Sequence, residues 1–157
     1  MPLTEHKYDF DSEPIFVLLA DDDEDDRRFF VEAFNEIKMR TKVKTVNDGD
    51  LLMKHLNNES LPLPDLLFLD LNMPMKNGFE CLYEIRHSKR LKDIAIVIYS
   101  TSGSEHDIEE AFVRGANVYI KKPNDFTSLK NILKKVMQIN WHYHTYGLDK
   151  ENFLLSL

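Results

Sequence analysis

The stretch that most constrains this chain is the run LLFL at residues 66–69, which is followed at once by Asp70. Four consecutive apolar residues predict a short strand that is buried on both faces, as in a parallel sheet. Pro74 and the pair Asn77-Gly78 predict a turn beyond that strand. Asp70 therefore stands at the C-terminal end of a buried strand, where open α/β sheets bind their ligands. Taken alone, Asp70 fits the cap of the following turn equally well.

Short apolar runs alternate with amphipathic segments along the rest of the chain. The expected strands are residues 15–20, 43–46, 66–69, 94–99 and 118–120. The expected helices are one that opens at the acids of residues 23–26, followed by residues 51–56, 79–87, 105–114 and 126–139. This alternation predicts an α/β fold with a doubly wound, five-stranded, mostly parallel sheet and helices on both faces. The strand at residues 43–46 is expected near an edge of the sheet.

The predicted elements define one domain over residues 15–139. Residues 1–14 form a polar leader, and residues 140–157 form a C-terminal tail. The tail holds the aromatic run WHYHTY at residues 141–146, whose two histidines do not by themselves indicate a metal site. We expect the tail to pack on the body of the domain or on a partner.

The composition excludes several classes of protein. A net charge of −7 argues against a protein that binds nucleic acid through a basic surface. No segment approaches the roughly 20 apolar residues of a membrane span, and no signal peptide is visible. The single cysteine, Cys81, cannot form an internal disulfide. We therefore expect a cytoplasmic protein without a nucleic-acid or membrane partner.

Charged and hydroxyl side chains follow the ends of four predicted strands. Asp21 and Asp22 follow the first strand, Asp70 the third, Ser100 the fourth, and Lys122 the fifth. Neighbouring carboxylates repel each other by about 4 kcal/mol per close pair at an effective dielectric constant of about 20. A divalent cation relieves this repulsion, and oxygen ligands favour Mg²⁺. A carboxylate nucleophile, a metal, a lysine and a hydroxyl are what phosphoryl transfer to an aspartate needs.

The acids at residues 23–26 have a simpler explanation than those at the strand end. Carboxylates favour the N-terminus of a helix, where the macrodipole is positive. We therefore interpret Asp23 as a residue that opens the helix and exclude it from the predicted metal site.

These motifs, in this order, resemble the receiver domains of two-component response regulators of the chemotaxis-protein type. The matching motifs are LLADD at residues 18–22, DLNMP at residues 70–74 with Gly78, Ser100-Thr101, Gly115-Ala116 and Lys122-Pro123. The resemblance covers residues 15–139 and implies the flavodoxin-like strand order 2-1-3-4-5.

The resemblance also implies roles for residues at the strand ends. Asp70 is the expected phospho-acceptor, and Lys122 the lysine that contacts the phosphoryl group. Asp21 and Asp22 are expected to hold Mg²⁺ together with Asp70 and the backbone carbonyl of Asn72. The side chains among these groups are also those that the strand-end pattern brings together, whereas the Asn72 carbonyl is implied by the resemblance alone.

Other positions correspond to switching and tuning residues of the family. Ser100 is the expected switch hydroxyl, and Tyr119 the switch aromatic. Asn72 and Ser102 lie where the family tunes the lifetime of the phosphorylated state. Thr101 is bulkier than the alanine that is frequent at its position, so we expect it to narrow access to the phosphoryl site.

The implied function is that of a stand-alone response regulator, not of an enzyme with a separate substrate. A sensor histidine kinase or a histidine phosphotransfer protein phosphorylates Asp70 with Mg²⁺ bound. Ser100 and Lys122 are then drawn toward the phosphoryl group, and Tyr119 turns inward. The face formed by the fourth helix, the fifth strand and the fifth helix changes shape for an unknown downstream protein. A homodimer is left open.

Two other classes of function remain to be separated from this one. A pseudo-receiver would keep the fold and bind a partner without being phosphorylated. A phosphohydrolase of the haloacid-dehalogenase family would carry a second Asp two residues after its nucleophile, where this chain has Asn72. Asn72 cannot protonate a leaving group, which argues against the hydrolase.

Overall fold

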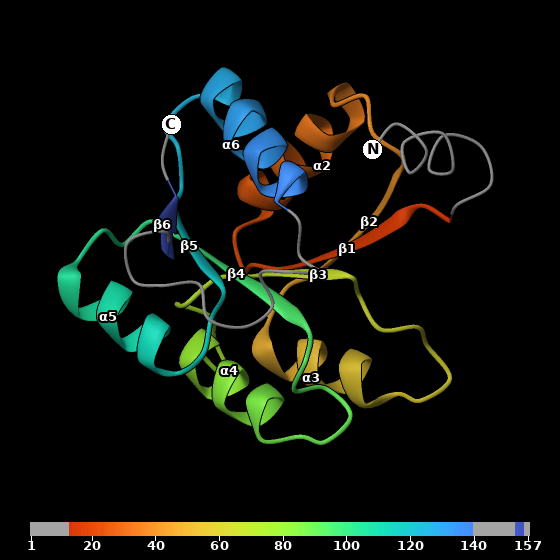
Figure 1. The fold of residues 1–157 in the computed structure, drawn as a ribbon, viewed down its shortest axis with the longest axis vertical. Helices are drawn as coiled ribbons and strands as arrows, with labels where there is room; N and C mark the ends of the chain where they lie inside the picture. The colour runs from red at the N-terminus through yellow and green to blue at the C-terminus, as the bar shows by residue number, and fades with distance from the viewer. Residues whose placement is uncertain (1–12, 140–152, 156–157) are drawn as a thin grey trace.

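The computed structural model describes residues 13–139 and 153–155, which form a six-stranded sheet with helices on both faces (Figure 1). The strands are β1 (Ile15–Ala20), β2 (Thr41–Val46), β3 (Leu66–Leu69), β4 (Ala95–Ser100), β5 (Val118–Lys121) and β6 (Leu154–Leu155). The helices are α2 (Glu24–Glu36), α3 (Gly49–Asn57), α4 (Gly78–Arg86), α5 (Glu105–Val113) and α6 (Phe126–Gln138).

The strand order is β2-β1-β3-β4-β5-β6, and every neighbouring pair is parallel. This confirms the doubly wound fold, the order 2-1-3-4-5 and the edge position of β2. From β1 the chain continues to β2 on one side and then crosses to β3 on the other. The crevice at the C-terminal ends of β1 and β3 is therefore the switch point of the sheet, where such folds bind ligands.

Helices cover both faces of the sheet and explain the unbroken apolar runs of the strands. Helices α2 and α6 pack on one face, and α3, α4 and α5 on the other (Figure 1). Every residue of β3 and β4 is buried, as expected of strands with helices on both sides.

Each helix begins at a polar side chain that accepts a hydrogen bond from a backbone N–H in the first turn. The capping residues are Asp23, Asp48, Asn77, Ser104 and Asp125. The prediction that Asp23 opens the first helix is thus confirmed, with its Oδ1 accepting from the N–H of Asp26 at 3.0 Å. Gly115, which follows the C-cap of α5, has a φ of 97°, a conformation that glycine adopts without strain.

The sheet has one strand more than the five predicted. Strand β6 pairs in parallel with β5, with Leu154 opposite Tyr119. Just before it, Phe153 is 1% exposed and packs its ring against those of Phe112 and Tyr119, with centroids 5.2 and 6.2 Å apart. Residues 153–155 of the tail thus pack on the body of the domain and extend the sheet. The leader at residues 1–12 and the aromatic run at residues 141–146 lie outside the described residues.

Within residues 13–139 and 153–155, no helix is long and apolar enough to cross a membrane.

Candidate functional site

The sheet brings four of the predicted site residues to its C-terminal edge. Asp21 follows β1, Asp70 follows β3, Ser100 ends β4, and Lys122 follows β5. Backbone hydrogen bonds continue the sheet past the strands, from the N–H of Asp70 to the carbonyl of Ala20 and from the N–H of Lys122 to that of Ser100. The positions of these side chains are therefore set by the register of the sheet.

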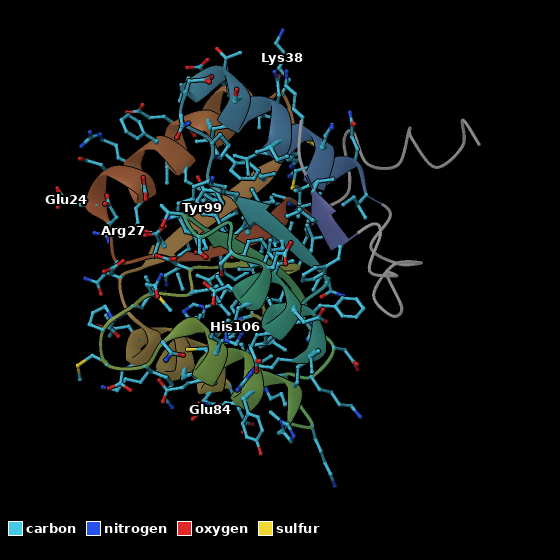
Figure 2. The ribbon with its side chains drawn as sticks, turned by 90° about the vertical axis from the view of Figure 1, so that its left-hand side faces the viewer. Glu24, Arg27, Lys38, Glu84, Tyr99 and His106 are labelled. Carbon is cyan, nitrogen blue, oxygen red and sulfur yellow. The ribbon has the colours of Figure 1, made fainter. Side chains whose placement is uncertain are left out.

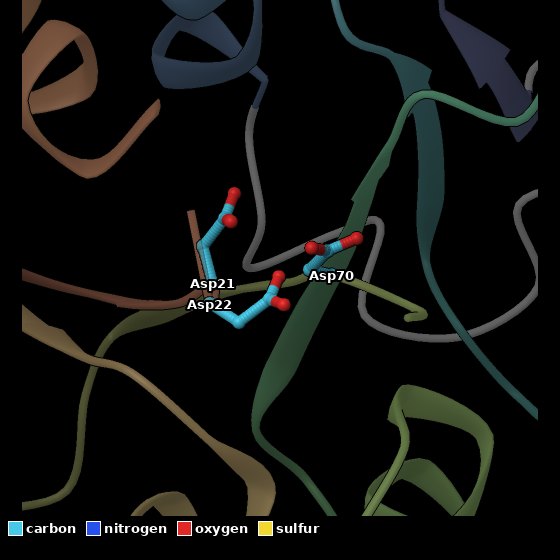
Figure 3. A group of neighbouring side chains, drawn as sticks. All are labelled: Asp21, Asp22 and Asp70. Carbon is cyan, nitrogen blue, oxygen red and sulfur yellow. The ribbon is translucent and has the colours of Figure 1, made fainter. Parts of the chain in front are cut away.

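Three carboxylates form an acidic triad at this edge, consisting of Asp21, Asp22 and Asp70 (Figure 3). Each offers an oxygen, and these oxygens lie within 4.8 Å of one another. Asp21 and Asp70 are buried, whereas Asp22 is exposed. Asp21 accepts a hydrogen bond from the N–H of Asp23 through Oδ1, and its buried Oδ2 faces the ammonium of Lys122. An all-oxygen donor set of this kind fits Mg²⁺.

Lys122 provides the positive charge beside the triad. Its Nζ lies 2.8 Å from Oδ2 of Asp21 and 3.6 Å from Oδ2 of Asp70. A third acid, Asp26 in the first turn of α2, also places Oδ2 at 2.8 Å from Nζ. The ammonium lies over the ring of Tyr99, 5.3 Å from its centroid. With a side chain only 8% exposed, Lys122 is enclosed by these groups.

Asp26 is the residue of this cluster that the sequence analysis missed. Its position is explained equally well by the preference of carboxylates for a helix N-terminus. No local pattern distinguishes Asp26 from Glu24 and Asp25 in the same turn, because its partner Lys122 lies 96 residues later in the chain.

Burial and the neighbouring charges shift the pKa values of Asp70, Asp21 and Lys122. Burial raises the pKa of Asp70 to about 7; Lys122 opposes this rise, and Asp21 adds to it. Burial likewise raises the pKa of Asp21, against its hydrogen bonds to Lys122 and Asp23. Burial on its own lowers the pKa of Lys122, but the pairs with Asp21 and Asp26 outweigh it and raise the pKa. Without a bound cation, burial therefore favours the protonated form of the Asp70 carboxyl, compared with an aspartate in water.

Hydrogen bonds connect both predicted switch residues, Ser100 and Tyr119, to Ser102. The N–H of Ser102 donates to Oγ of Ser100 at 3.1 Å, and the hydroxyl of Tyr119 donates to the carbonyl of Ser102 at 2.8 Å. Oγ of Ser102 donates to Oδ2 of Asp107 at 2.6 Å. Tyr119 is fully buried. The predicted inward turn of Tyr119 therefore describes a position that its ring already occupies here.

The loop after β3 passes close to the acceptor. A Cβ atom at Gly78 would lie 2.3 Å from the carbonyl oxygen of Asp70, so only glycine fits there. The backbone N–H of Asn72 hydrogen-bonds to the carboxylate of Asp70, and the side chain of Asn72 is exposed. Thr101 is also exposed, at the start of the loop after β4. The metal-binding role of the Asn72 carbonyl and the tuning roles of Asn72, Thr101 and Ser102 stay predictions.

Comparison with known sequences identifies the family of this chain. The response regulator receiver domain family matches residues 17–134. The response regulator Rcp1 of Synechocystis sp. is 32% identical over 130 residues, covering 80% of this chain and 86% of Rcp1. The probable methanogenesis regulatory protein FilR2 of Methanothrix harundinacea is 27% identical over 135 residues, covering 83% of this chain and 87% of FilR2.

Solved structures agree with the sequence comparisons. The phosphorylated cyanobacterial phytochrome response regulator RcpA superposes with a TM-score of 0.74 at 34% identity, covering 80% of this chain and 92% of RcpA. The Mn²⁺-bound form of Rcp1 gives a TM-score of 0.71 at 30% identity, covering 85% of this chain and 97% of Rcp1. With its flavodoxin-like fold and the acidic edge of its sheet, this chain belongs to the receiver domain family of two-component response regulators.

Proposed function

We propose that this chain accepts a phosphoryl group on Asp70 from a histidine kinase or a histidine phosphotransfer protein. Receiver domains of this kind receive phosphoryl groups from histidine kinases and act on downstream targets. The observation that carries the proposal is the placement of Asp70. It stands 5% exposed at the end of β3, with two further carboxylates and a lysine around it.

The chemistry follows from these groups. An oxygen of the Asp70 carboxylate attacks the phosphorus of a phosphohistidine, and the new O–P bond forms as the P–N bond breaks. The leaving imidazole keeps the electron pair of that bond. Lys122 and the hydroxyl of Ser100 then pair with the phosphoryl oxygens.

A bound cation fits the same site. Mg²⁺ would be held by Asp21, Asp22, Asp70 and the carbonyl of Asn72, and it would neutralise the carboxylates and the phosphoryl oxygens. The all-oxygen acidic triad and the solved Mn²⁺-bound form of the relative Rcp1 both support this assignment.

The proposed output surface is the face formed by α5, β5 and α6, and strand β6 lies beside β5 in the sheet. When Ser100 turns to the phosphoryl group, the N–H of Ser102 loses its acceptor and the loop before α5 is free to move. This loop also holds the hydroxyl of Tyr119, so the change reaches β5. We propose that a downstream protein reads this face in the cytoplasm, and that the chain does not act as an enzyme on a separate substrate.

The decisive experiment is the intact mass after incubation with acetyl phosphate or phosphoramidate, with and without Mg²⁺. Wild type should gain one phosphoryl group only with Mg²⁺, and Asp70→Asn should gain none. Asp25→Asn, which makes the same charge change at an exposed position, is the matched control. A folded, Mg²⁺-binding wild type that gains no phosphoryl group would favour the pseudo-receiver. Asp70-dependent turnover of a phosphomonoester would instead favour the hydrolase.

Once acceptance is established, the choice of donor kinase can be tested. Response regulators of phytochromes occur among the structural relatives, including RcpA and the bacteriophytochrome regulator RtBRR. Sensor kinases of the phytochrome type are therefore the first donors to test. Transfer to wild type and not to Asp70→Asn is the expected result.

A further inference from the structure

We propose that Asp26 is a positioning residue that restrains Lys122 and thereby slows phosphoryl transfer to Asp70, an inference that rests on the proposed function. The ammonium of Lys122 must reach the phosphoryl oxygens to stabilise them. In this structure its nearest partners are two other acids, both at 2.8 Å, while the acceptor carboxylate lies at 3.6 Å. Lys122 is thus held closer to its competitors than to the site of the chemistry.

The two competing acids are not equivalent. Asp21 belongs to the acidic triad, so a divalent cation bound there would take up part of its charge and repel the ammonium. Asp26 lies outside the triad and keeps its full charge when the cation binds. Asp26 is therefore the acid whose hold on Lys122 persists in the metal-loaded, reactive state.

The helix does not need Asp26 at this position. Asp23 already caps α2, and Glu24 and Asp25 place two further carboxylates in its first turn. The macrodipole is thus satisfied without Asp26. What distinguishes Asp26 is its partly buried side chain, 32% exposed, which points at Lys122, whereas Asp25 is 68% exposed and pairs with Arg28.

The surroundings leave the ammonium room to move. A cavity of about 210 Å³ between α2 and the start of α6 is lined by Asp26, Tyr99 and Lys122, among others. Figure 2 shows the first turn of α2, marked by Glu24 and Arg27, on the side of the molecule where Tyr99 lies. The ammonium of Lys122 therefore borders open space beside Asp26 and the Tyr99 ring, and Oδ2 of Asp70 lies 3.6 Å from its Nζ.

Removing the charge of Asp26 should release Lys122 toward the acceptor. Asp26→Asn keeps the size of the side chain and an oxygen that can accept a hydrogen bond, but it loses the ionic attraction. We expect the rate constant for phosphorylation by acetyl phosphate at saturating Mg²⁺ to rise about 3- to 10-fold. Asp25→Asn, with the same change of net charge in the same turn, should leave the rate constant within about 1.5-fold of wild type.

A double-mutant cycle separates this mechanism from a general charge effect. The rate constants are measured by intact mass over time for wild type, Asp26→Asn, Lys122→Met and the double variant. If Asp26 acts through Lys122, Asp26→Asn accelerates the wild type but not the Lys122→Met background. Asp26→Glu, which restores the charge, should return the rate constant toward that of wild type.

The possible outcomes each decide the question. An unchanged or lower rate constant in Asp26→Asn overturns the proposal, and so does an equal rise in Asp25→Asn or in the Lys122→Met background. If wild type takes up no phosphoryl group at all, the proposed function fails and this inference fails with it. If Asp26→Asn does not fold, Asp26→Ser takes its place with the same expected rise.

Discussion

At the scale of the residue, burying the charged carboxylate of Asp70 costs folding free energy. Its pKa of about 7 lies well above the ordinary value of 3.8, mainly because the buried carboxylate is poorly solvated. Between these two pH values the folded chain binds more protons than the unfolded chain, so this group lowers the free energy of unfolding as the pH rises. Above pH 7, the stability of the metal-free protein is reduced by the full free-energy cost of burying the ionised carboxylate of Asp70.

Asp70→Asn removes that cost, since an amide has no charge to bury. In EDTA at pH 8 we expect the variant to have a free energy of unfolding about 2 kcal/mol higher than wild type. The difference should shrink as the pH falls from 7 to 4, where wild type keeps its proton. Urea unfolding at a series of pH values measures it, and parallel profiles for the two proteins would contradict the assigned cause. Mg²⁺ should stabilise wild type more than the variant.

The residues of this site show what sequence alone can reveal. Asp21, Asp22, Asp70, Ser100 and Lys122 were predictable because each lies at the end of a strand, and parallel strands end at one edge. Asp26 was not, because its carboxylate comes from inside a helix. Its closeness to Lys122 depends on how α2 packs on the sheet. Strand-end residues can be read from local patterns, whereas contacts across layers cannot.

Met75 presents a separate residue-scale test. It has a φ of 70° and a side chain that is 76% exposed, so its backbone is strained and its side chain makes few contacts. Met75→Gly should therefore raise the free energy of unfolding by about 0.5 to 1 kcal/mol. Met39→Gly, at an exposed loop position without a positive φ, should lower it instead, because glycine adds freedom to the unfolded chain. Urea unfolding measures the free energy of unfolding of both variants. A loss of stability in both would contradict the strain argument.

At the scale of the element, local sequence patterns account for most of the helices and strands, but they do not account for strand β6. The five capped helices and the five longer strands have apolar patterns and capping residues of their own. Strand β6 has only Leu154 and Leu155, too short a run to show a period. It exists because β5 offers an open edge and because Phe153 fills the space beside Tyr119 and Phe112. Tertiary contacts, which no local pattern records, create this strand.

Phe153 should therefore hold β6 in place. Phe153→Ala removes a ring that is 1% exposed and should lower the free energy of unfolding by about 2 to 4 kcal/mol. Leu154→Ala, at a neighbouring side chain that is 47% exposed, should change it by less than about 1 kcal/mol. Loss of β6 also uncovers the edge of β5, so Phe153→Ala should self-associate at higher concentration in sedimentation experiments. Equal effects of the two substitutions would show that Phe153 is not the anchor.

At the scale of the whole molecule, the site and the last strand are linked through the sheet. The acidic triad stands at the ends of β1 and β3, and Ser100 at the end of β4. Hydrogen bonds at Ser102 connect Ser100 to Tyr119 on β5, and Tyr119 packs on Phe153 beside β6. If Ser100 turns to a phosphoryl group on Asp70, as proposed, these contacts carry the change to the edge of the sheet opposite β2.

Beryllofluoride with Mg²⁺, which imitates an acyl phosphate on a carboxylate, tests this coupling by amide hydrogen exchange. Exchange at Ser102 should speed up as Ser100 turns away from its N–H, and protection should change at β5 and at residues 153–155. Strand β2, at the opposite edge of the sheet, and helix α3, which packs on one face of the sheet, share none of these hydrogen bonds and should stay as they were. Asp70→Asn should show no response to beryllofluoride. Changes confined to the neighbours of Asp70 would mean that the C-terminal strand is a fixed part of the sheet and takes no part in the switch.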